Sequence, residues 1–269
     1  MKLKNWVTLH DSLVQMRVPF HIEKTTREIK FFHPFTIDKC DTFLDMTNNN
    51  LPISELNFIK QVKAYCNTLE LHYDIDREQI KYIDTIRIYE GLQIENVYEV
   101  DLNSAYWNFA YKEGIISKDI YEKGLTVSKP TRLAALGALA KNVYKWNFDG
   151  KQWHISKPVE GEKANYFFRC CQLTGEIMNE LKYVSGSDFI FFWVDAILFK
   201  PSSLHLIEQY LQLNELPYKK HFCEKIKVEN GLIKVYSEDW KREKENKGKR
   251  VKNPREFFIK KNNFDLLTT

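Results

Sequence analysis

The chain has 269 residues, which is long enough for one large domain or two small ones with a hydrophobic core. It is 43% hydrophobic and 28% charged, with 18 Phe, 14 Tyr and 6 Trp, and this composition excludes a disordered, collagenous or low-complexity protein. The five cysteines form no CxxC pair and have no histidine at ligand spacing, which argues against a disulfide framework or a zinc ribbon. We find no N-terminal signal segment and no apolar run long enough to cross a bilayer, so we expect a cytoplasmic protein without a membrane partner.

The formal charge of +4 is unevenly distributed along the chain. From Lys241 to Lys261 there are ten Lys or Arg residues and three acidic ones, so this segment carries +7 and the remainder −3. A basic tail on a mildly acidic body predicts a polyanionic partner bound at residues 241–269. The alternative is a solvated tail that contributes only solubility.

The predicted elements follow from hydrophobic periodicity and turn residues. In the first half of the chain we expect an irregular segment over 1–50, a helix from Pro52 to Cys66, strands over 80–88 and 97–102, and a helical region over 103–124 with Gly114 and Gly124 as stops. A helix over 132–145 capped by Thr131 and a hairpin over 147–154, with Asp149 and Gly150 at its turn, should follow. The remaining elements are a helix over 162–183, a continuous buried strand over 189–199, a helix over 204–213, and a hairpin of 222–228 with 232–236 joined through Asn230 and Gly231. Strands and helices mixed with several hairpins predict an α+β fold.

Two acidic residues occupy positions where a carboxylate is costly. Asp101 lies near the end of the strand predicted over 97–102, and Asp195 lies within the apolar run 189–199. A carboxylate in such a setting requires a partner or a metal ion, and two on neighbouring strands would repel each other unless they shared divalent cations. That arrangement is typical of two-metal phosphoryl transfer. The alternative is a structural Asp195 that is paired with a buried cation or turned to solvent.

The segment Asp101-Leu-Asn-Ser-Ala-Tyr106 closely resembles motif A of family B DNA polymerases, particularly of the protein-primed, phage-type members. The resemblance implies that Asp101 binds both metal ions and that Tyr106 stacks beneath the sugar of the incoming nucleotide. It also implies that the backbone between them cradles the triphosphate, at Leu102, Asn103, Ser104 and Ala105.

Two further segments are similar to later motifs of the same family. Trp193-Val-Asp195-Ala resembles a reduced motif C, in which Asp195 matches the second, metal-binding acid of a hairpin and Trp193 replaces the first. The segment from Arg132 to Lys141 is similar to motif B on a fingers helix, although the family's Asn and Tyr are absent. The resemblance implies that Arg132 and Lys141 neutralise the phosphates of the nucleotide.

The resemblance covers about residues 80–236 and implies a polymerase-like palm, in which a small antiparallel sheet packs on helices. We therefore expect an accessory region over 1–75, a palm over 76–240 with a short helical fingers insertion at about 107–150, and a basic tail over 241–269. The implied activity is template-directed nucleotidyl transfer with two Mg²⁺ or Mn²⁺ ions in phage or mobile-element DNA replication. The implied partners are a DNA template–primer, deoxynucleoside triphosphates, and a priming protein or other replication subunits. Residues expected to contact nucleic acid are Lys225, Lys227, Lys241, Arg242, Lys249 and Arg250.

A second hypothesis is a catalytically inactive, polymerase-derived palm that serves as a nucleic-acid-binding or assembly factor. Trp193 in place of an acid and the missing motif B residues favour this alternative. A rolling-circle nuclease would need two metal-binding histidines flanking one residue, and no His-x-His occurs among the seven histidines.

Overall fold

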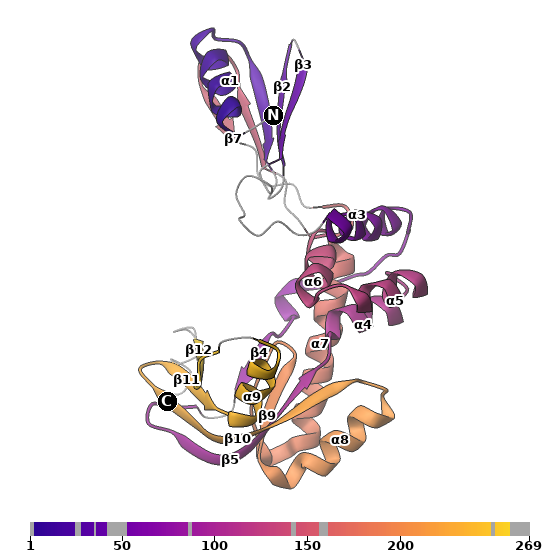
Figure 1. Ribbon diagram of the computed structural model, residues 1–269, viewed down its shortest axis with the longest axis vertical. Helices are drawn as coiled ribbons and strands as arrows, with labels where there is room; N and C mark the ends of the chain where they lie inside the picture. The colour runs from indigo at the N-terminus through magenta and orange to yellow at the C-terminus, as the bar shows by residue number, and fades with distance from the viewer. Residues whose placement is uncertain are drawn as a thin grey trace. The chain divides into compact units, whose positions relative to one another are not determined.

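A computed structural model describes residues 3–24, 28–34, 36–41, 53–85, 88–140, 144–155, 161–248 and 251–258. The chain has an α+β fold, as predicted, and every strand pair in the described part is antiparallel (Figure 1). It divides into two units. Unit 1 comprises Met1–Ile75 and Ala110–Arg169, and unit 2 comprises Asp76–Phe109 and Cys170–Thr269. Unit 1 therefore combines the N-terminal region with the segment in which we expected the fingers insertion.

Unit 1 contains a five-stranded sheet in the order β3 (Thr36–Asp41), β2 (Glu28–His33), β1 (Phe20–Lys24), β6 (Tyr144–Phe148) and β7 (Trp153–Ile155), together with helix α1 (Leu3–Gln15). A hydrophobic cluster on this sheet contains Leu13, Phe20, Ile22, Phe31 and Phe148. The expectation of an irregular segment over 1–50 is wrong. Each strand has only five or six residues, so its alternation of apolar and polar positions is too brief to stand out in the sequence.

The hairpin between β6 and β7 forms as predicted. The Asp149 carboxylate accepts hydrogen bonds from the backbone N–H groups of Lys151, at 2.7 Å, and Gln152, at 2.9 Å. Gly150 has a φ of 95°, a conformation that glycine adopts readily.

The helix predicted over 132–145 is wrong at both ends. Helix α6 spans Lys129–Gly137, and its N-cap is Ser128, whose hydroxyl accepts from the N–H of Thr131 at 3.3 Å. The chain then enters β6 because Tyr144 pairs with Lys24 of β1. Long-range strand pairing thus overrides the local helix preference of this Ala- and Leu-rich segment.

The other short helices follow the predicted order with one difference. Helix α3 (Ile53–Asn67) agrees with the prediction, and Gly114, with a φ of 70°, follows the end of α4 (Ala105–Lys112). Gly124 does not stop a helix, since it lies inside α5 (Lys118–Thr126). The region 103–124 therefore forms separate helices. The long helix α7 spans Ala164–Ser185, close to the predicted 162–183.

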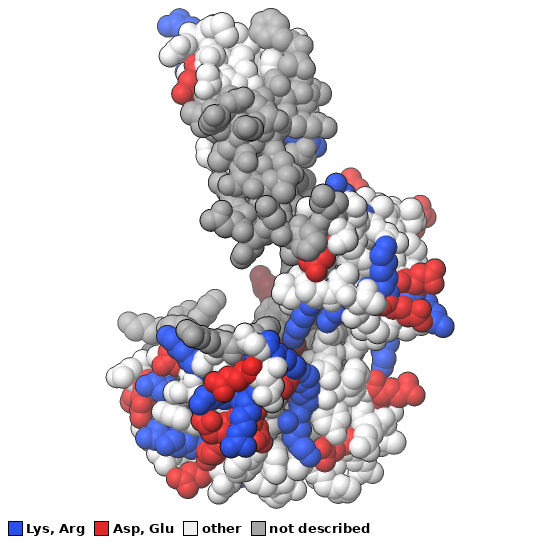
Figure 2. All heavy atoms as spheres, viewed as in Figure 1, with Lys and Arg blue, Asp and Glu red and all other residues white. Residues whose placement is uncertain are grey.

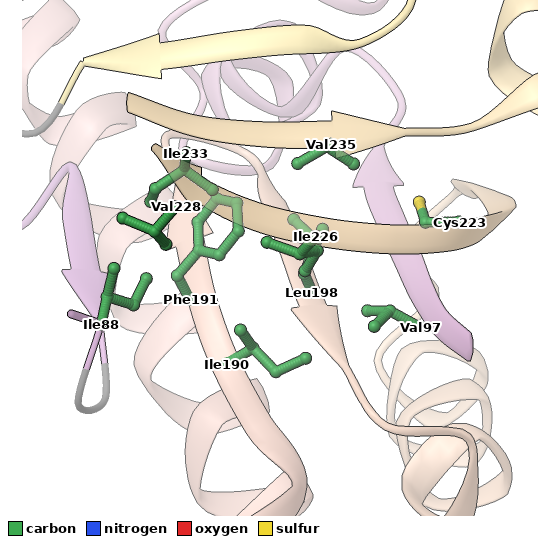
Figure 3. Close-up of a cluster of buried hydrophobic side chains, with 10 residues drawn as sticks. All are labelled: Ile88, Val97, Ile190, Phe191, Leu198, Cys223, Ile226, Val228, Ile233 and Val235. Atoms are coloured by element: carbon green, nitrogen blue, oxygen red, sulfur yellow. The ribbon is translucent and has the colours of Figure 1, made fainter. Parts of the chain in front are cut away.

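Unit 2 is built on a seven-stranded sheet in the order β12 (Arg255–Phe258), β11 (Leu232–Tyr236), β10 (Tyr218–Glu229), β5 (Gln93–Leu102), β9 (Ala196–Phe199), β8 (Phe189–Trp193) and β4 (Ile83–Thr85). A hydrophobic cluster on this sheet contains Ile88, Val97, Ile190, Phe191, Leu198, Cys223, Ile226, Val228, Ile233 and Val235 (Figure 3). Asn96, with a φ of 54°, interrupts the regular alternation of β5. Beyond it Val97 and Glu99 are buried, and Asp101 is half-buried.

The continuous strand predicted over 189–199 is wrong, because the run folds back as the β8–β9 hairpin. Trp193 pairs with Ala196, so Val194 and Asp195 form a two-residue turn. Both strands are largely buried and apolar, and the turn contains no Gly, Pro or Asn that would reveal it. A hairpin at this place is what the resemblance to motif C implied.

The C-terminal part of unit 2 begins with helix α8 (Leu204–Leu213), which has the predicted bounds. The β10–β11 hairpin turns through Asn230 and Gly231, which have φ values of 55° and 70°. Helix α9 (Glu238–Asn246) and strand β12 follow, so much of the basic segment predicted as a tail is part of the fold. Short 3₁₀ helices occupy Arg77–Gln79, Gly186–Asp188 and Pro201–Ser203. Within the described ranges, no helix has the length and apolar character needed to cross a membrane.

Candidate functional site

Asp101 and Asp195 lie on neighbouring strands of the unit 2 sheet. Asp101 pairs with Ala196 of β9, and the N–H of Leu102 donates to the carbonyl oxygen of Asp195 at 2.9 Å. Both aspartates are half-buried. Two acidic residues that are far apart in the sequence are thus brought side by side at one end of β5.

The backbone near each aspartate has a left-handed conformation that is unusual for these residues. Val194, directly before Asp195, has a φ of 58°, and Ser104, just after the strand that carries Asp101, has a φ of 52°. A left-handed conformation costs about 1–2 kcal/mol for a residue other than glycine, and it is especially rare for a β-branched one. Such strain is often found at functional sites, where the surrounding structure enforces it.

The turn after Asp101 is fixed by hydrogen bonds to its backbone. The N–H of Asn103 donates to the carbonyl of Pro217 at 2.8 Å, and the side-chain amide of Asn108 donates to the carbonyl of Asn103 at 2.8 Å. Of the predicted triphosphate cradle, Leu102 and Asn103 therefore use their N–H groups within the protein. Ala105 begins helix α4, which also contains Tyr106.

Tyr106 lies within the electrostatic influence of Asp195. Burial, together with Cys171 and the Asp195 carboxylate, raises the pKa of Tyr106 far above its ordinary value. The hydroxyls of Tyr106 and Tyr82 hydrogen-bond to the Cys171 thiol, whose pKa is raised by burial to about 11. Burial likewise raises the pKa of Tyr82 to about 12. These hydroxyls and this thiol therefore stay protonated at neutral pH.

Basic side chains gather on the Asp101 side of the sheet. Lys219 of β10 is the strand partner of Asp101 and lies 2.5 Å from a carboxylate oxygen of Glu243 on α9. The negative charge of Asp101 also acts on the Lys244 ammonium and on the Arg255 guanidinium. Figure 2 shows acidic and basic side chains interspersed over the part of unit 2 that contains α9 and β10.

A buried ion pair lies two residues before Asp101 along β5. Arg255 Nη1 donates to Glu99 Oε1 at 2.7 Å, and Arg255 Nη2 donates to Glu99 Oε2. Burial opposes the charge of Arg255, but the hydrogen bonds and charge of Glu99 raise the pKa of its guanidinium. Sequence reasoning missed this pair because Arg255 was counted with the basic tail. The available signal was Glu99 itself, a charged residue between Tyr98 and Val100.

The predicted motif B residues lie in unit 1. Arg132 Nη1 donates to the carbonyls of Gly124, at 2.9 Å, and Val127, at 2.8 Å, at the end of α5. Burial lowers the pKa of Arg132. Leu136 and Leu139, at positions where the family has polar residues, are core residues. Lys141 lies outside the described residues.

The predicted nucleic-acid-binding residues are divided between structural contacts and solvent. Lys225 Nζ lies 4.6 Å from the centre of the Tyr236 ring, and Lys227 Nζ lies 3.6 Å from Glu229. On α9, Lys241 Nζ lies 3.5 Å from Glu238, and Arg242 is exposed. Lys249 and Arg250 lie outside the described residues.

The donor atoms at Asp101 and Asp195 suit a hard divalent cation. Carboxylate oxygens are the ligands that Mg²⁺ prefers, and one or two of them suffice where water and substrate phosphates complete the coordination. In the part of the chain that the structure describes, no group of three or more His, Cys, Asp or Glu side chains is placed to hold a metal.

Comparison with known proteins gives no relative, since no protein-family model and no curated protein matches the chain.

Proposed function

We propose that unit 2 is a polymerase-like palm that catalyses template-directed nucleotidyl transfer, with Asp101 and Asp195 as its catalytic acids. The observation that carries the proposal is the pairing of Asp101 with Ala196, which sets the Asp195 turn beside the end of β5. The left-handed Val194 in that turn supports it, because a strained conformation persists only where the surrounding structure enforces it, and such positions cluster at functional sites.

In this reaction the 3′-hydroxyl of a primer attacks the α-phosphorus of a nucleoside triphosphate. A new P–O bond forms, pyrophosphate leaves, and the hydroxyl proton passes to solvent. The chemistry that two divalent ions supply when bound at Asp101 and Asp195 is activation of the attacking hydroxyl and stabilisation of charge on the phosphate oxygens. Tyr106, held protonated beside Asp195, supports the sugar of the incoming nucleotide. Lys219, the strand partner of Asp101, adds positive charge on the same side of the sheet.

A second candidate is a palm that binds nucleic acid without catalysis. The observation that favours it is Trp193, whose ring lies 5.3 Å from the ring of Phe257, so the position of the first motif C acid is filled by core packing. In this case Asp101 and Asp195 would persist as half-buried remnants, and the protein would bind primed DNA with equal affinity whether or not they were present.

The test is primer extension by Asp101→Asn and Asp195→Asn on a primed DNA template with Mg²⁺ or Mn²⁺. The ions contribute several kcal/mol of transition-state stabilisation, so each variant should lose about 10³-fold or more in rate. The melting temperature should stay nearly unchanged, because both aspartates are only half-buried and asparagine has nearly the same shape as aspartate. Asp119→Asn, on the exposed first turn of α5, is the matched control and should retain full activity.

Full activity of Asp101→Asn would refute the catalytic assignment. If the wild-type protein binds the primed template but incorporates no nucleotide, the palm without catalysis is the correct candidate.

A further inference from the structure

Helix α9 is attached to the half of β10 that β11 does not cover. Strand β11 pairs only with Lys225 to Glu229 of β10. Along the uncovered half, the Ser237 hydroxyl donates to the carbonyl of Phe222 at 2.6 Å, and the N–H of Phe222 donates to the Asp239 carboxylate at 3.2 Å. The helix thus covers an exposed strand edge, and its position on the sheet is fixed at its N-terminus.

Glu243 then places the next turn of α9 beside Asp101. Its carboxylate accepts from Lys219 Nζ at 2.5 Å, lies 2.6 Å from His221 Nε2, and also pairs with Lys247. Lys219 is the strand partner of Asp101, so the contact with Glu243 sets this part of the helix at the level of the candidate catalytic acid.

Strand β12 fixes the far end of the same segment. Its Arg255 binds the buried carboxylate of Glu99, and Glu99 lies two residues before Asp101, on the same face of β5. The segment from Glu238 to Phe258 is therefore held both before and after Lys244.

We propose that Lys244 and Lys219 form a phosphate-binding site beside Asp101, which takes the phosphate oxygens of a nucleoside triphosphate. The identity of that ligand rests on the proposed function, whereas the anion site itself does not. Lys219 and Lys247 both pair with the single carboxylate of Glu243, and Lys244 Nζ lies 5.6 Å from the ring centre of Trp240, which Arg255 also contacts, so positive charge is in excess. The negative charge of Asp101 offsets part of this excess. That charge would no longer be available if Asp101 held a divalent ion.

The electrostatics of Lys244 agree with such a site. Burial lowers the pKa of Lys244, the neighbouring Lys219 and Lys247 lower it further, and Glu243 and Asp101 oppose that effect. An anion beside this ammonium would favour its charged form. Phosphate oxygens accept charge-assisted hydrogen bonds from ammonium groups, which are stronger than neutral ones.

The experiment is a titration with inorganic tripolyphosphate in the presence of EDTA, measured by calorimetry and by the fluorescence of Trp240, whose ring centre lies 5.6 Å from Lys244 Nζ. The wild-type protein should bind the probe, and Lys244→Gln should weaken binding by about tenfold or more, because one charge-assisted hydrogen bond is lost. Lys244→Arg should restore most of the affinity. Lys220→Gln, next to Lys219 on β10 but paired with Glu208 at 2.8 Å, is the matched control and should bind as the wild type does.

Absence of binding to the wild-type protein would overturn the site, as would an equal loss of affinity in Lys220→Gln and Lys244→Gln. Melting temperatures equal to that of the wild type would show that a loss of tripolyphosphate affinity does not come from unfolding. If Lys244→Gln selectively loses tripolyphosphate while the wild type incorporates no nucleotide, the anion site stands and the polymerase function fails. If Asp101→Asn abolishes incorporation but Lys244→Gln binds normally, the function stands and the site fails.

Discussion

The ion pair between Glu99 and Arg255 makes the strongest prediction about the stability of unit 2. The side chains of these two residues are only 3% and 15% exposed. Removing the guanidinium leaves a buried carboxylate beside the imidazole of His221, whose Nδ1 lies 3.8 Å from Glu99 Oε2. Because an uncompensated buried charge is costly, Arg255→Met should lower the free energy of unfolding by about 3–5 kcal/mol. Methionine keeps the apolar stem, so packing losses stay small.

The assay is urea unfolding followed by tryptophan fluorescence, to which Trp240 contributes because the Arg255 guanidinium lies 4.6 Å from its ring centre. The matched control is Arg169→Met in unit 1. Arg169 Nε lies 2.8 Å from Glu113, but these side chains are 26% and 24% exposed, so the expected loss is only about 1 kcal/mol or less. The double variant Glu99→Leu with Arg255→Met should recover most of the stability, since no buried charge is left. A loss below about 1 kcal/mol in Arg255→Met would refute the reasoning, because that is the magnitude of a solvated surface pair.

Three further predictions concern the hairpin, the helix and the salt dependence. Val194→Asn should raise the free energy of unfolding by about 0.5–1 kcal/mol in the same urea assay, because asparagine tolerates the φ of 58° better than valine. A decrease would contradict the assigned turn. Burial raises the pKa of Glu243, but hydrogen bonds from Lys219, Lys247 and His221 outweigh it and lower the pKa below the usual 4.5. The charged Glu243 therefore adds its full stabilisation above the usual carboxylate pKa, and this stabilisation is lost as the pH falls towards the lowered pKa. Glu243→Gln should thus lower the free energy of unfolding clearly at pH 7, and the difference from the wild type should shrink towards pH 3. If Lys241 and Arg242 contact phosphates, replacing both with Ser should reduce the slope of log K against log salt for DNA binding by about 2, and an unchanged slope would exclude them as contacts.

Elements with local signals could be predicted from the sequence, because their boundaries depend on neighbouring residues. Helix α8 has the predicted bounds, and the turns at Asp149–Gly150 and Asn230–Gly231 form where these dipeptides favour them. The elements that were missed depend on distant partners. Helix α6 ends early because β6 pairs with β1, and the Val194–Asp195 turn has no local marker because it is set by the pairing of β8 with β9.

The candidate site shows the same division between local and distant information. The acidic residues were visible because Asp101 and Asp195 stand out against apolar neighbours. The groups around them were not visible, since Glu99 and Arg255 are 156 residues apart in the sequence and no spacing rule connects them. The ion pairs could not be predicted either, because a count of charges along the chain does not reveal which of them neutralise one another in space.

The basic segment after residue 240 therefore has a different meaning in the folded protein. Arg255 neutralises Glu99, Lys247 pairs with Glu243, and Lys241 lies near Glu238, so several of its charges pair with acidic side chains of unit 2. The same contacts hold α9 against β10 and bring Lys244 within the electrostatic influence of Asp101. Ion pairing thus makes much of a segment that was predicted as a tail a part of folded unit 2. A consequence is that deleting residues 241–269 would unfold part of unit 2, so point substitutions are the proper test of its contribution to binding.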